Sequence, residues 1–469
     1  MNKRAIRSCL IFFSALFLGF SCTKSTSLPT AECWLSTRNG QLKFQLQAEP
    51  ILFDNSRTTT EKIIAVNPDI QYQTMDGFGF SLTGGSAFHI HRLEDMTRAA
   101  LLDELFSTTG NHIGISYLRV SIGASDLDDH VFSYNDLPTG ETDPDLTNFN
   151  LGPDTLHLIP LLREILAVNP SIKIMGSPWS PPVWMKDNRH SIGGSLLPEF
   201  YASYANYFVK YVQAMEAEGI SIDAITVQNE PLHPGNNPSL LMLAEDQAEF
   251  IKNHLGPAFE ANQIETKIVI YDHNADRIDY PLEILDDPEA AQYVDGSAFH
   301  LYGGEIEALS QVHEAYPDKN LYFTEQWVGA PGKFEENMPW HIKNLIIGAS
   351  RNWCKTVLEW NLAADANQDP HTEGGCTRCL GALTIGDEVT RNVAYYIIAH
   401  ASKFVRPGSV RIASNEQENL PNVAFKTPDG KIVLIVMNES DEEQVFSIKF
   451  EERTATVQLN AGDVATYVW

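Results

Sequence analysis

The sequence predicts an α/β protein with a (β/α)8, or TIM, barrel and a side β-sandwich formed by both ends of the chain. Between residues 76 and 404, eight short apolar runs alternate with long amphipathic segments. Parallel strands need helical crossovers, and eight such units close a ring. The flanking residues 31–75 and 405–469 have strand-like patterns without a long helical period.

The composition suits a large folded core and excludes some functions. The chain has 469 residues, of which 43% are hydrophobic, enough for more than one domain-sized unit. Its formal net charge of −28 argues against a nucleic-acid partner, because polyphosphate binding needs basic patches. The same acidity disfavours charge-driven adhesion to an anionic membrane.

Residues 1–21 have the pattern of a signal peptide: a basic start, then an apolar segment too short to span a bilayer as a stable helix. Cys22 follows, and residues 22–30 form a polar tether. The arrangement is similar to a bacterial lipoprotein signal, in which the cysteine is acylated after cleavage. We therefore expect an exported protein that is lipid-anchored to the outer membrane through Cys22 and has no other membrane contact. An ordinary cleaved signal peptide is the alternative.

The barrel elements follow in order. Strands are expected to begin near Gly77, Ile115, Ile172, Ala224, Lys267, Gly296, Asn320 and Lys355. Helices are expected over residues 94–106, 155–168, 198–218, 244–262, 281–291, 305–316, 338–352 and 389–404. The helix over 198–218 has the clearest pattern, because Tyr201, Tyr204 and Phe208 recur at three- and four-residue steps. Gly219 ends it.

An open, doubly wound sheet is the alternative arrangement. It usually binds a nucleotide at a glycine-rich turn after the first strand. The candidate turn, Gly77-Phe78-Gly79, lacks the third glycine of that fingerprint, and so the closed barrel is favoured. After residue 404, short strands are expected over residues 432–436, 445–448, 455–459 and 464–469.

Two of the predicted barrel strands end in a glutamate. An apolar run over residues 224–231 closes on Glu230 and Pro231, and a second run over residues 320–327 reaches Glu325. Proline cannot donate to a sheet ladder, so the first strand should stop at Pro231 with Glu230 on the rim. The carboxyl ends of barrel strands share one opening. Glycoside hydrolysis needs two carboxylates that meet in this way.

Polar and aromatic residues end the other predicted strands and are candidates for substrate contacts. They are Arg119, Asp126, Trp179, Asn229, His300, Tyr302, Trp360 and Asn361. Asp272 and His273, at the fifth strand, suit a substrate contact or loop structure equally. Aromatic faces at such a rim suit a carbohydrate, because they stack on the apolar faces of pyranose rings.

Cys376 and Cys379 form a C-x-x-C pair, a pattern found in redox, zinc and disulfide sites. Structural zinc would need a second pair, which the chain lacks. In an exported protein a disulfide is the favoured interpretation. His89 and His91 lie two residues apart without a third ligand in view, and no metal site is expected.

Five motifs together resemble those of glycoside hydrolase family 30. They are Gly77-Phe78-Gly79, Ser177-Pro178-Trp179, Asn229-Glu230-Pro231, Phe323-Thr324-Glu325 and Glu359-Trp360-Asn361-Leu362. The family includes glucosylceramidases and β-1,6-glucanases, and the resemblance covers nearly the whole mature chain. Residues 371–379 depart from the glucosylceramidases, which carry an aromatic and an asparagine there. A disulfide-stiffened loop resembles the β-1,6-glucanase branch more.

The resemblance implies roles for the candidates. Glu230 is expected to be the acid/base and Glu325 the nucleophile of a retaining mechanism. Arg119 is expected to keep Glu325 ionised while Glu230 keeps its proton, Tyr302 to hydrogen-bond Glu325, and Asn229 to hold the sugar 2-hydroxyl. The remaining expected substrate contacts are Asp126, Trp179, His300, Trp360 and Asn361.

The sequence therefore predicts a retaining β-glycoside hydrolase, first of all a β-1,6-glucanase acting on β-1,6-linked glucan. No cofactor is expected, since two glutamates supply the proton transfers, and we expect a monomer. A glucosylceramidase-like β-glucosidase or a β-xylosidase of the same family is the nearest alternative. A non-catalytic glycan-binding lipoprotein is the alternative from another class, and two intact glutamates count against it.

Overall fold

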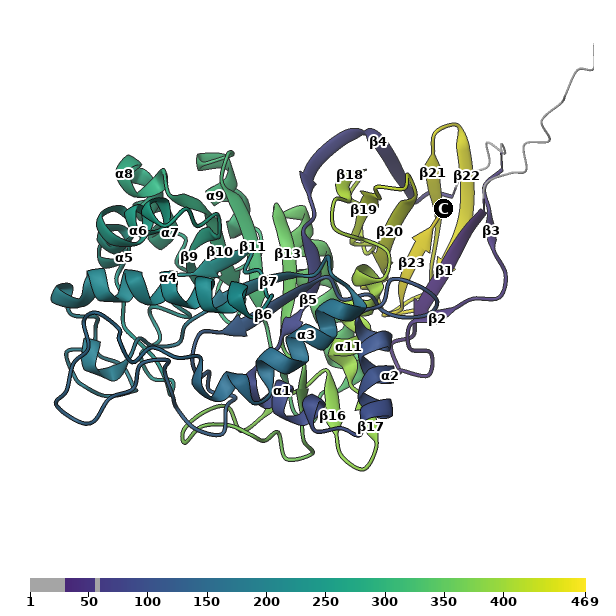
Figure 1. Cartoon of the computed structure of the whole chain (residues 1–469). Helices are drawn as coiled ribbons and strands as arrows, with labels where there is room; N and C mark the ends of the chain where they lie inside the picture. Colours follow the sequence, from purple (N-terminus) through teal and green to yellow (C-terminus); the bar gives the residue numbers. More distant parts are fainter. Residues whose placement is uncertain (1–29, 55–59) are drawn as a thin grey trace, which may run out of the picture.

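The computed structural model describes residues 30–54 and 60–469. A barrel of strands and helices lies beside an all-β unit that contains the C-terminal end (Figure 1). The expected signal peptide, Cys22 and all but the last residue of the expected tether lie outside the described residues. Within those residues, no helix is long and apolar enough to cross a membrane.

Eight parallel strands close the barrel in the order β5-β6-β7-β8-β9-β10-β11-β13. Their bounds are β5 Gly77–Ser81, β6 Tyr117–Ser121, β7 Lys173–Ser177, β8 Ala224–Thr226, β9 Lys267–Asn274, β10 Val294–His300, β11 Asn320–Glu325 and β13 Cys354–Asn361. Each lies on one of the predicted apolar runs, and the predicted (β/α)8 barrel is confirmed.

The helices largely follow the predicted ranges. They are α1 Gly84–His91, α2 Asp95–Phe106, α3 Leu158–Val168, α4 Tyr201–Ala217, α5 Ala244–Phe250, α6 Gly256–Ala261, α7 Asp279–Asp286, α8 Pro288–Ala291, α9 Ala308–Ala315, α10 Phe334–His341 and α11 Val393–Ser402. A π-helical segment, Ile251–Leu255, joins α5 to α6, and another, Ile342–Ala349, follows α10. The prediction of a helix from residue 389 is wrong at its start, because β17 (Val389–Arg391) pairs with β16 (Leu383–Ile385).

Helix α1, which contains His89 and His91, is absent from the sequence-based prediction. Two glycines open it, and glycine is a poor helix former. The hydroxyl of Thr83 compensates by accepting the backbone N–H of Ser86 at 3.1 Å, which caps the first turn. In Figure 1, α1, β16 and β17 lie at the lower end of the barrel, away from β4.

Both ends of the chain build the β-sandwich, as predicted. Its strands are β1 Thr30–Ser36, β2 Gln45–Leu46, β3 Ile51–Leu52, β4 Ile63–Thr74, β18 Val410–Ser414, β19 Asn422–Lys426, β20 Ile432–Met437, β21 Gln444–Phe450, β22 Arg453–Leu459 and β23 Val464–Val468. Nine of them follow the order β2-β1-β23-β20-β19-β18-β4-β21-β22, and β3 pairs with β1. The N-terminal strand β4 thus lies between the C-terminal strands β18 and β21.

Inside the barrel, an apolar layer supports a polar layer. The apolar layer consists of Tyr117, Met175, Ala224, Val269, Ala298, Tyr322 and Leu358. Side chains alternate along a strand, so residues two positions further also point inward. Among these, Arg119, Ser177, Thr226 and Thr324 are fully buried. Their hydrogen-bonding groups form the floor of the site.

Candidate active site

Glu230 and Glu325 meet above this floor. A carboxylate oxygen of each and a ring nitrogen of His300 all lie within 4.8 Å of one another. Both glutamates line a cavity of about 460 Å³, a size typical of small-ligand sites. The other lining residues are Asp126, Trp179, Asn229, His233, Asn236, His273, Asn274, Tyr302, Trp327, Trp360, Gly374, Gly375, Cys376 and Cys379.

Glu230 reaches the cavity on a turn. The expectation of a strand running to Pro231 is wrong, because β8 ends at Thr226. Glu230 has a φ of +44°, in the left-handed region that non-glycine residues seldom adopt. Its backbone N–H donates to the carbonyl of Asp272 at 3.0 Å, which holds the turn against β9. Backbone strain of this kind concentrates at functional sites.

Arg119 connects the site from below. Its Nη1 donates to Glu325 Oε2 at 2.6 Å. Its Nη2 lies 2.6 Å from Asn229 Oδ1, 2.9 Å from Asp272 Oδ2 and 3.2 Å from Ser177 Oγ. One fully buried guanidinium therefore fixes side chains from strands on opposite sides of the barrel.

A bulge in β9 places Asp272 inside the barrel. Simple alternation from Val269 would point Tyr271 inward and Asp272 outward. Tyr271 and Asp272 instead have φ values of +72° and +66°, and the register with β10 shifts at this point. Asp272 accepts hydrogen bonds from Thr226 at 2.7 Å and Thr324 at 2.6 Å. It is thus an internal counter-ion, which the sequence pattern left open.

His300 lies between three carboxylates. Its Nε2 is 3.1 Å from Asp272 Oδ1, and its Nδ1 is 3.3 Å from Glu230 Oε1 and 3.9 Å from Glu325 Oε1. Burial lowers the pKa of His300, but the charge of Glu325 and the hydrogen bonds to Asp272 and Glu230 outweigh it and raise the pKa to about 9. The ring is therefore an imidazolium at neutral pH, in which both nitrogens donate.

The two glutamates face this charge differently. At Glu230, burial raises the pKa, but the hydrogen bond and charge of His300 lower it overall. At Glu325, burial together with the charge of Glu230 outweighs His300 and Arg119, and the pKa is raised. Of the two carboxylates, Glu230 receives the hydrogen bond from His300, at 3.3 Å, whereas Glu325 Oε1 lies 3.9 Å from the same nitrogen. This difference accounts for the opposite directions of the two pKa shifts.

Aromatic rings form the other parts of the wall. The phenol of Tyr302 donates to Glu325 Oε1 at 3.0 Å, as expected. The rings of Trp179 and Trp360 lie with their centroids 5.4 Å apart. The guanidinium carbon of Arg119 is 4.9 Å from the Trp179 centroid and 5.8 Å from that of Trp360. This cation–π contact holds both indoles above the floor.

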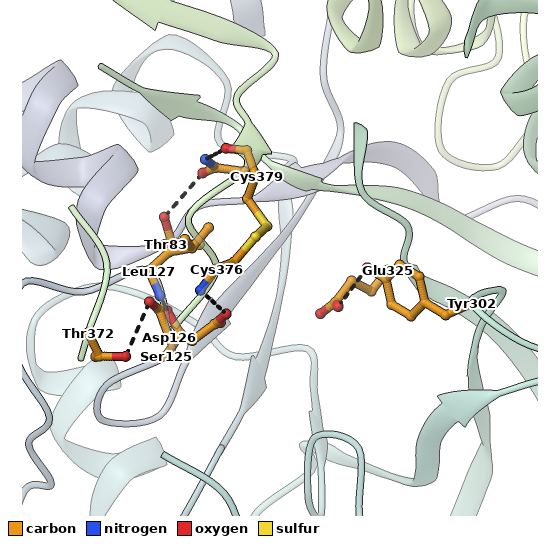
Figure 2. Close-up of a disulfide and its surroundings, with 10 residues drawn as sticks. Thr83, Ser125, Asp126, Leu127, Tyr302, Glu325, Thr372, Cys376 and Cys379 are labelled. Atoms are coloured by element: carbon orange, nitrogen blue, oxygen red, sulfur yellow. Dashed lines mark hydrogen bonds between the residues drawn. A yellow bond between two sulfur atoms is a disulfide. The ribbon is translucent and has the colours of Figure 1, made fainter. Parts of the chain in front are cut away.

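The disulfide loop forms the wall opposite Glu325 (Figure 2). Cys376 and Cys379 are bonded, with their Cα atoms 5.7 Å apart. The backbone N–H of Cys376 donates to Asp126 Oδ2 at 3.3 Å. Burial and the charges of Glu325 and Glu230 raise the pKa of Asp126 to about 7. The loop therefore holds the side chain of Asp126 in place through this hydrogen bond.

Three of the predicted contact residues do not line the cavity. The Oδ1 of Asn361 accepts from Ser86 Oγ at 2.9 Å, and its Nδ2 donates to the carbonyl of Cys379 at 3.3 Å. Its amide is thus used within the protein. Arg119 and His300 are fully buried and contact the carboxylates instead. A strand-end pattern gives a residue's position, but not whether its polar groups are already paired.

Some lining residues have no strand-end signal. Among them, His233 and Asn236 lie on the loop after β8 and line the same cavity as Glu230. Loop residues of this kind follow no regular spacing from the strand, and only the folded loop reveals them.

Comparisons with known proteins match this architecture to a family. Residues 75–405 match the glycosyl hydrolase family 30 TIM-barrel domain, and residues 408–467 match the family's β-sandwich domain. An endo-1,6-β-D-glucanase of Neurospora crassa is 34% identical over 88% of this chain and 89% of its own. The lysosomal acid glucosylceramidase of Mus musculus is 30% identical over 94% of this chain and 90% of its own. The solved structure of the endo-β1,6-glucanase BT3312 has a TM-score of 0.87 at 36% identity, covering 94% of this chain and 99% of that one. The chain therefore belongs to glycosyl hydrolase family 30.

Proposed function

We propose that this chain is a retaining endo-β-1,6-glucanase in which Glu325 is the nucleophile and Glu230 the acid/base. The observation that carries the mechanism is the approach of the two carboxylates to within 4.8 Å. Retaining pairs stand about 5–5.5 Å apart, whereas inverting pairs stand about 6.5–9.5 Å apart to leave room for a water. The spacing here suits direct attack by one carboxylate on the sugar.

The reaction takes two steps. In the first, a carboxylate oxygen of Glu325 bonds to the anomeric carbon. The glycosidic carbon–oxygen bond breaks with its electron pair, and Glu230 gives its proton to the departing oxygen. In the second, Glu230 takes a proton from water, the water oxygen bonds to the anomeric carbon, and Glu325 leaves as a carboxylate. Two inversions give net retention.

His300 is the source of the proton that Glu230 donates in the first step. Its imidazolium Nδ1 lies 3.3 Å from Glu230 Oε1, so a proton moving across this contact gives neutral imidazole and a protonated Glu230. Arg119 and Tyr302 meanwhile stabilise the negative charge of Glu325 by two hydrogen bonds. The pair Glu230–His300 thus serves as the acid when substrate is bound.

The substrate class rests on the relatives. Two proteins named endo-1,6-β-glucanases are 34% and 36% identical over most of this chain. The mouse glucosylceramidase, at 30% identity, supports a second candidate, a β-glucosidase acting on a terminal glucose. The disulfide-stiffened loop favours the glucanase, because that loop departs from the glucosylceramidase pattern.

A panel of substrates tests the proposal. Purified protein is incubated with β-1,6-, β-1,3- and β-1,4-glucan, xylan and glucosylceramide, and the products are sized. We expect reducing ends from β-1,6-glucan first, as a mixture of oligosaccharides. Release of glucose from glucosylceramide alone would favour the second candidate, and inactivity on β-1,6-glucan would refute the proposal.

We also propose that the mature protein is anchored by a lipid on Cys22. The basic and apolar pattern of residues 1–21 and the cysteine that follows support this. Cells fed a labelled fatty acid are expected to label the wild type and not a Cys22→Ala variant. Equal labelling of both would contradict the anchor.

A further inference from the structure

We propose that a second cavity beside the nucleophile is a sugar-binding subsite, placed to hold the glucosyl unit on the non-reducing side of the cleaved bond. The proposal rests on the proposed function and adds the residues that recognise a chain longer than a disaccharide. It gives roles to Trp340 and Gln326, which the reaction itself does not use.

The second cavity adjoins the first. It measures about 470 Å³. Its lining residues are Gln326, Trp327, Gly329, Ala330, Pro331, Gly332, Lys333, Glu336, Asn337, Trp340, His341 and Arg378. Trp327 lines both cavities, and Gln326 directly follows Glu325. A chain held at Glu325 can therefore continue past Trp327 without leaving the protein surface.

Two indoles provide aromatic faces in this cavity. Trp340 is 40% exposed, the most exposed of the chain's eight tryptophans, all of which lie within the described residues. The indole of Trp327 packs closely over Gly329, where an added Cβ would lie only 3.2 Å from the ring. An indole presents a broad apolar face and carries a polar N–H at its edge. Such a face suits the C–H side of a glucose ring.

The polar groups of this cavity are one buried acceptor without a partner and, at the rim, cationic side chains that have partners. Gln326 is only 7% exposed, and its Oε1 has no hydrogen-bond partner. A buried acceptor without a partner is unfavourable, and a sugar hydroxyl would satisfy it. At the rim, Lys333 pairs with Glu336 at 2.7 Å, and Arg378 donates to the carbonyl of Ala330 at 2.8 Å. Mixed charges of this kind suit a neutral glycan rather than an anion.

The position of the acid/base indicates which side of the bond this cavity serves. Glu230 protonates the leaving oxygen, so the leaving sugar lies on the side of the loop after β8, which carries Glu230, His233 and Asn236. None of these residues lines the second cavity, which is lined instead by Gln326 and Trp327, the residues directly after Glu325. A sugar bound there precedes the one that is attacked. The attacked sugar is then inside a chain and not at its end, which gives cleavage within the polymer.

A chain-length series tests the subsite. Values of kcat/KM are measured for β-1,6-linked gluco-oligosaccharides of two to six units with the wild type, Trp340→Ala and Trp340→Phe. Trp340→Ala is expected to lose about 3- to 10-fold on the longer substrates, as expected for one aromatic contact, mostly through KM, and least on the disaccharide. Trp340→Phe keeps an aromatic face and should recover most of this loss. Met96→Ala, a truncation of a 77% exposed side chain on α2, is the surface control.

Equal effects of Trp340→Ala at all lengths, or none at any length, would overturn the subsite while leaving the proposed function intact. Inactivity of the wild type on the whole series would instead refute the proposed function. In that case, calorimetric titration of Glu325→Gln with β-1,6-, β-1,3- and β-1,4-linked glucotetraose still tests whether the second cavity binds a glucan. Tighter binding to Glu325→Gln than to Glu325→Gln/Trp340→Ala upholds the subsite, and equal or absent binding refutes it.

Discussion

Truncation of Glu230 and truncation of Glu325 are expected to lower the activity to different extents. Glu325→Ala removes the group that bonds to the sugar and should abolish turnover. Glu230→Ala should lower kcat by about 10²- to 10⁴-fold, the contribution of a positioned acid/base, with a smaller loss on an activated aryl glycoside. Azide should restore turnover of Glu230→Ala and yield a β-glycosyl azide, identified by NMR.

Both variants are expected to unfold close to the wild-type temperature, because Arg119 keeps its ion pair with Asp272 at 2.9 Å when Glu325 is removed. Wild-type rates in Glu325→Ala would refute the nucleophile. An α-glycosyl azide from Glu230→Ala would refute retention.

His300 is expected to set the pH at which the carboxyl pair ionises. Its positive charge lowers the pKa of Glu230 and opposes the rise at Glu325. The neutral variant His300→Gln should therefore move the acidic limb of the kcat/KM profile to higher pH. His273→Gln is the matched control, since burial lowers the pKa of His273 to about 4 and the ring is neutral above about pH 5. The same shift in both variants would contradict this role.

The loop over residues 371–379 is expected to act on binding more than on chemistry. The N–H of Cys376 holds Asp126, whose carbonyl also accepts from the N–H of Thr372 at 3.0 Å. The double variant Cys376→Ser/Cys379→Ser should therefore raise KM several-fold and change kcat little, because neither glutamate forms a hydrogen bond or ion pair with the described residues 371–379. Steady-state kinetics with and without a reducing agent measure this. A fall in kcat at unchanged KM would show that the loop instead positions the reacting groups.

Hydrophobic periodicity predicts the alternating strands and helices, and therefore the barrel. It also predicts that Glu230 and Glu325 lie at the carboxyl ends of barrel strands. Periodicity does not predict the bulge in β9, because left-handed φ values at Tyr271 and Asp272 are imposed by the neighbouring strands and by Arg119. The sequence pattern also does not predict helix α1. Its two glycines have a low helix propensity, and only the Thr83 cap and packing in the barrel offset this.

Helix α11 joins the barrel to the sandwich through His400. Its Nδ1 lies 2.9 Å from Thr466 Oγ1 in β23, and its Nε2 lies 2.8 Å from Ser36 Oγ in β1. Burial lowers the pKa of His400 from 6.5 to about 3. The unfolded chain takes up a proton below pH 6.5 that the folded protein excludes down to about pH 3. Acid therefore favours unfolding in that window.

His400→Asn should reduce this loss. The lowered pKa corresponds to a loss of about 5 kcal/mol in the free energy of unfolding between pH 6.5 and pH 3. Urea unfolding across this range is expected to show a steeper fall in the free energy of unfolding for the wild type than for the variant, although the variant is less stable at pH 7. Parallel curves would contradict a proton-linked junction.

The first and last strands of the described chain are direct neighbours, with Glu32 opposite Val468. β1 has its main partner only once β23 has been synthesised. Pairing between such distant segments is slow, and β1 can pair with β23 only after residues 464–468 have been synthesised. We therefore expect the β-sandwich to close late in folding, and removal of β23 would leave β1 without its main partner.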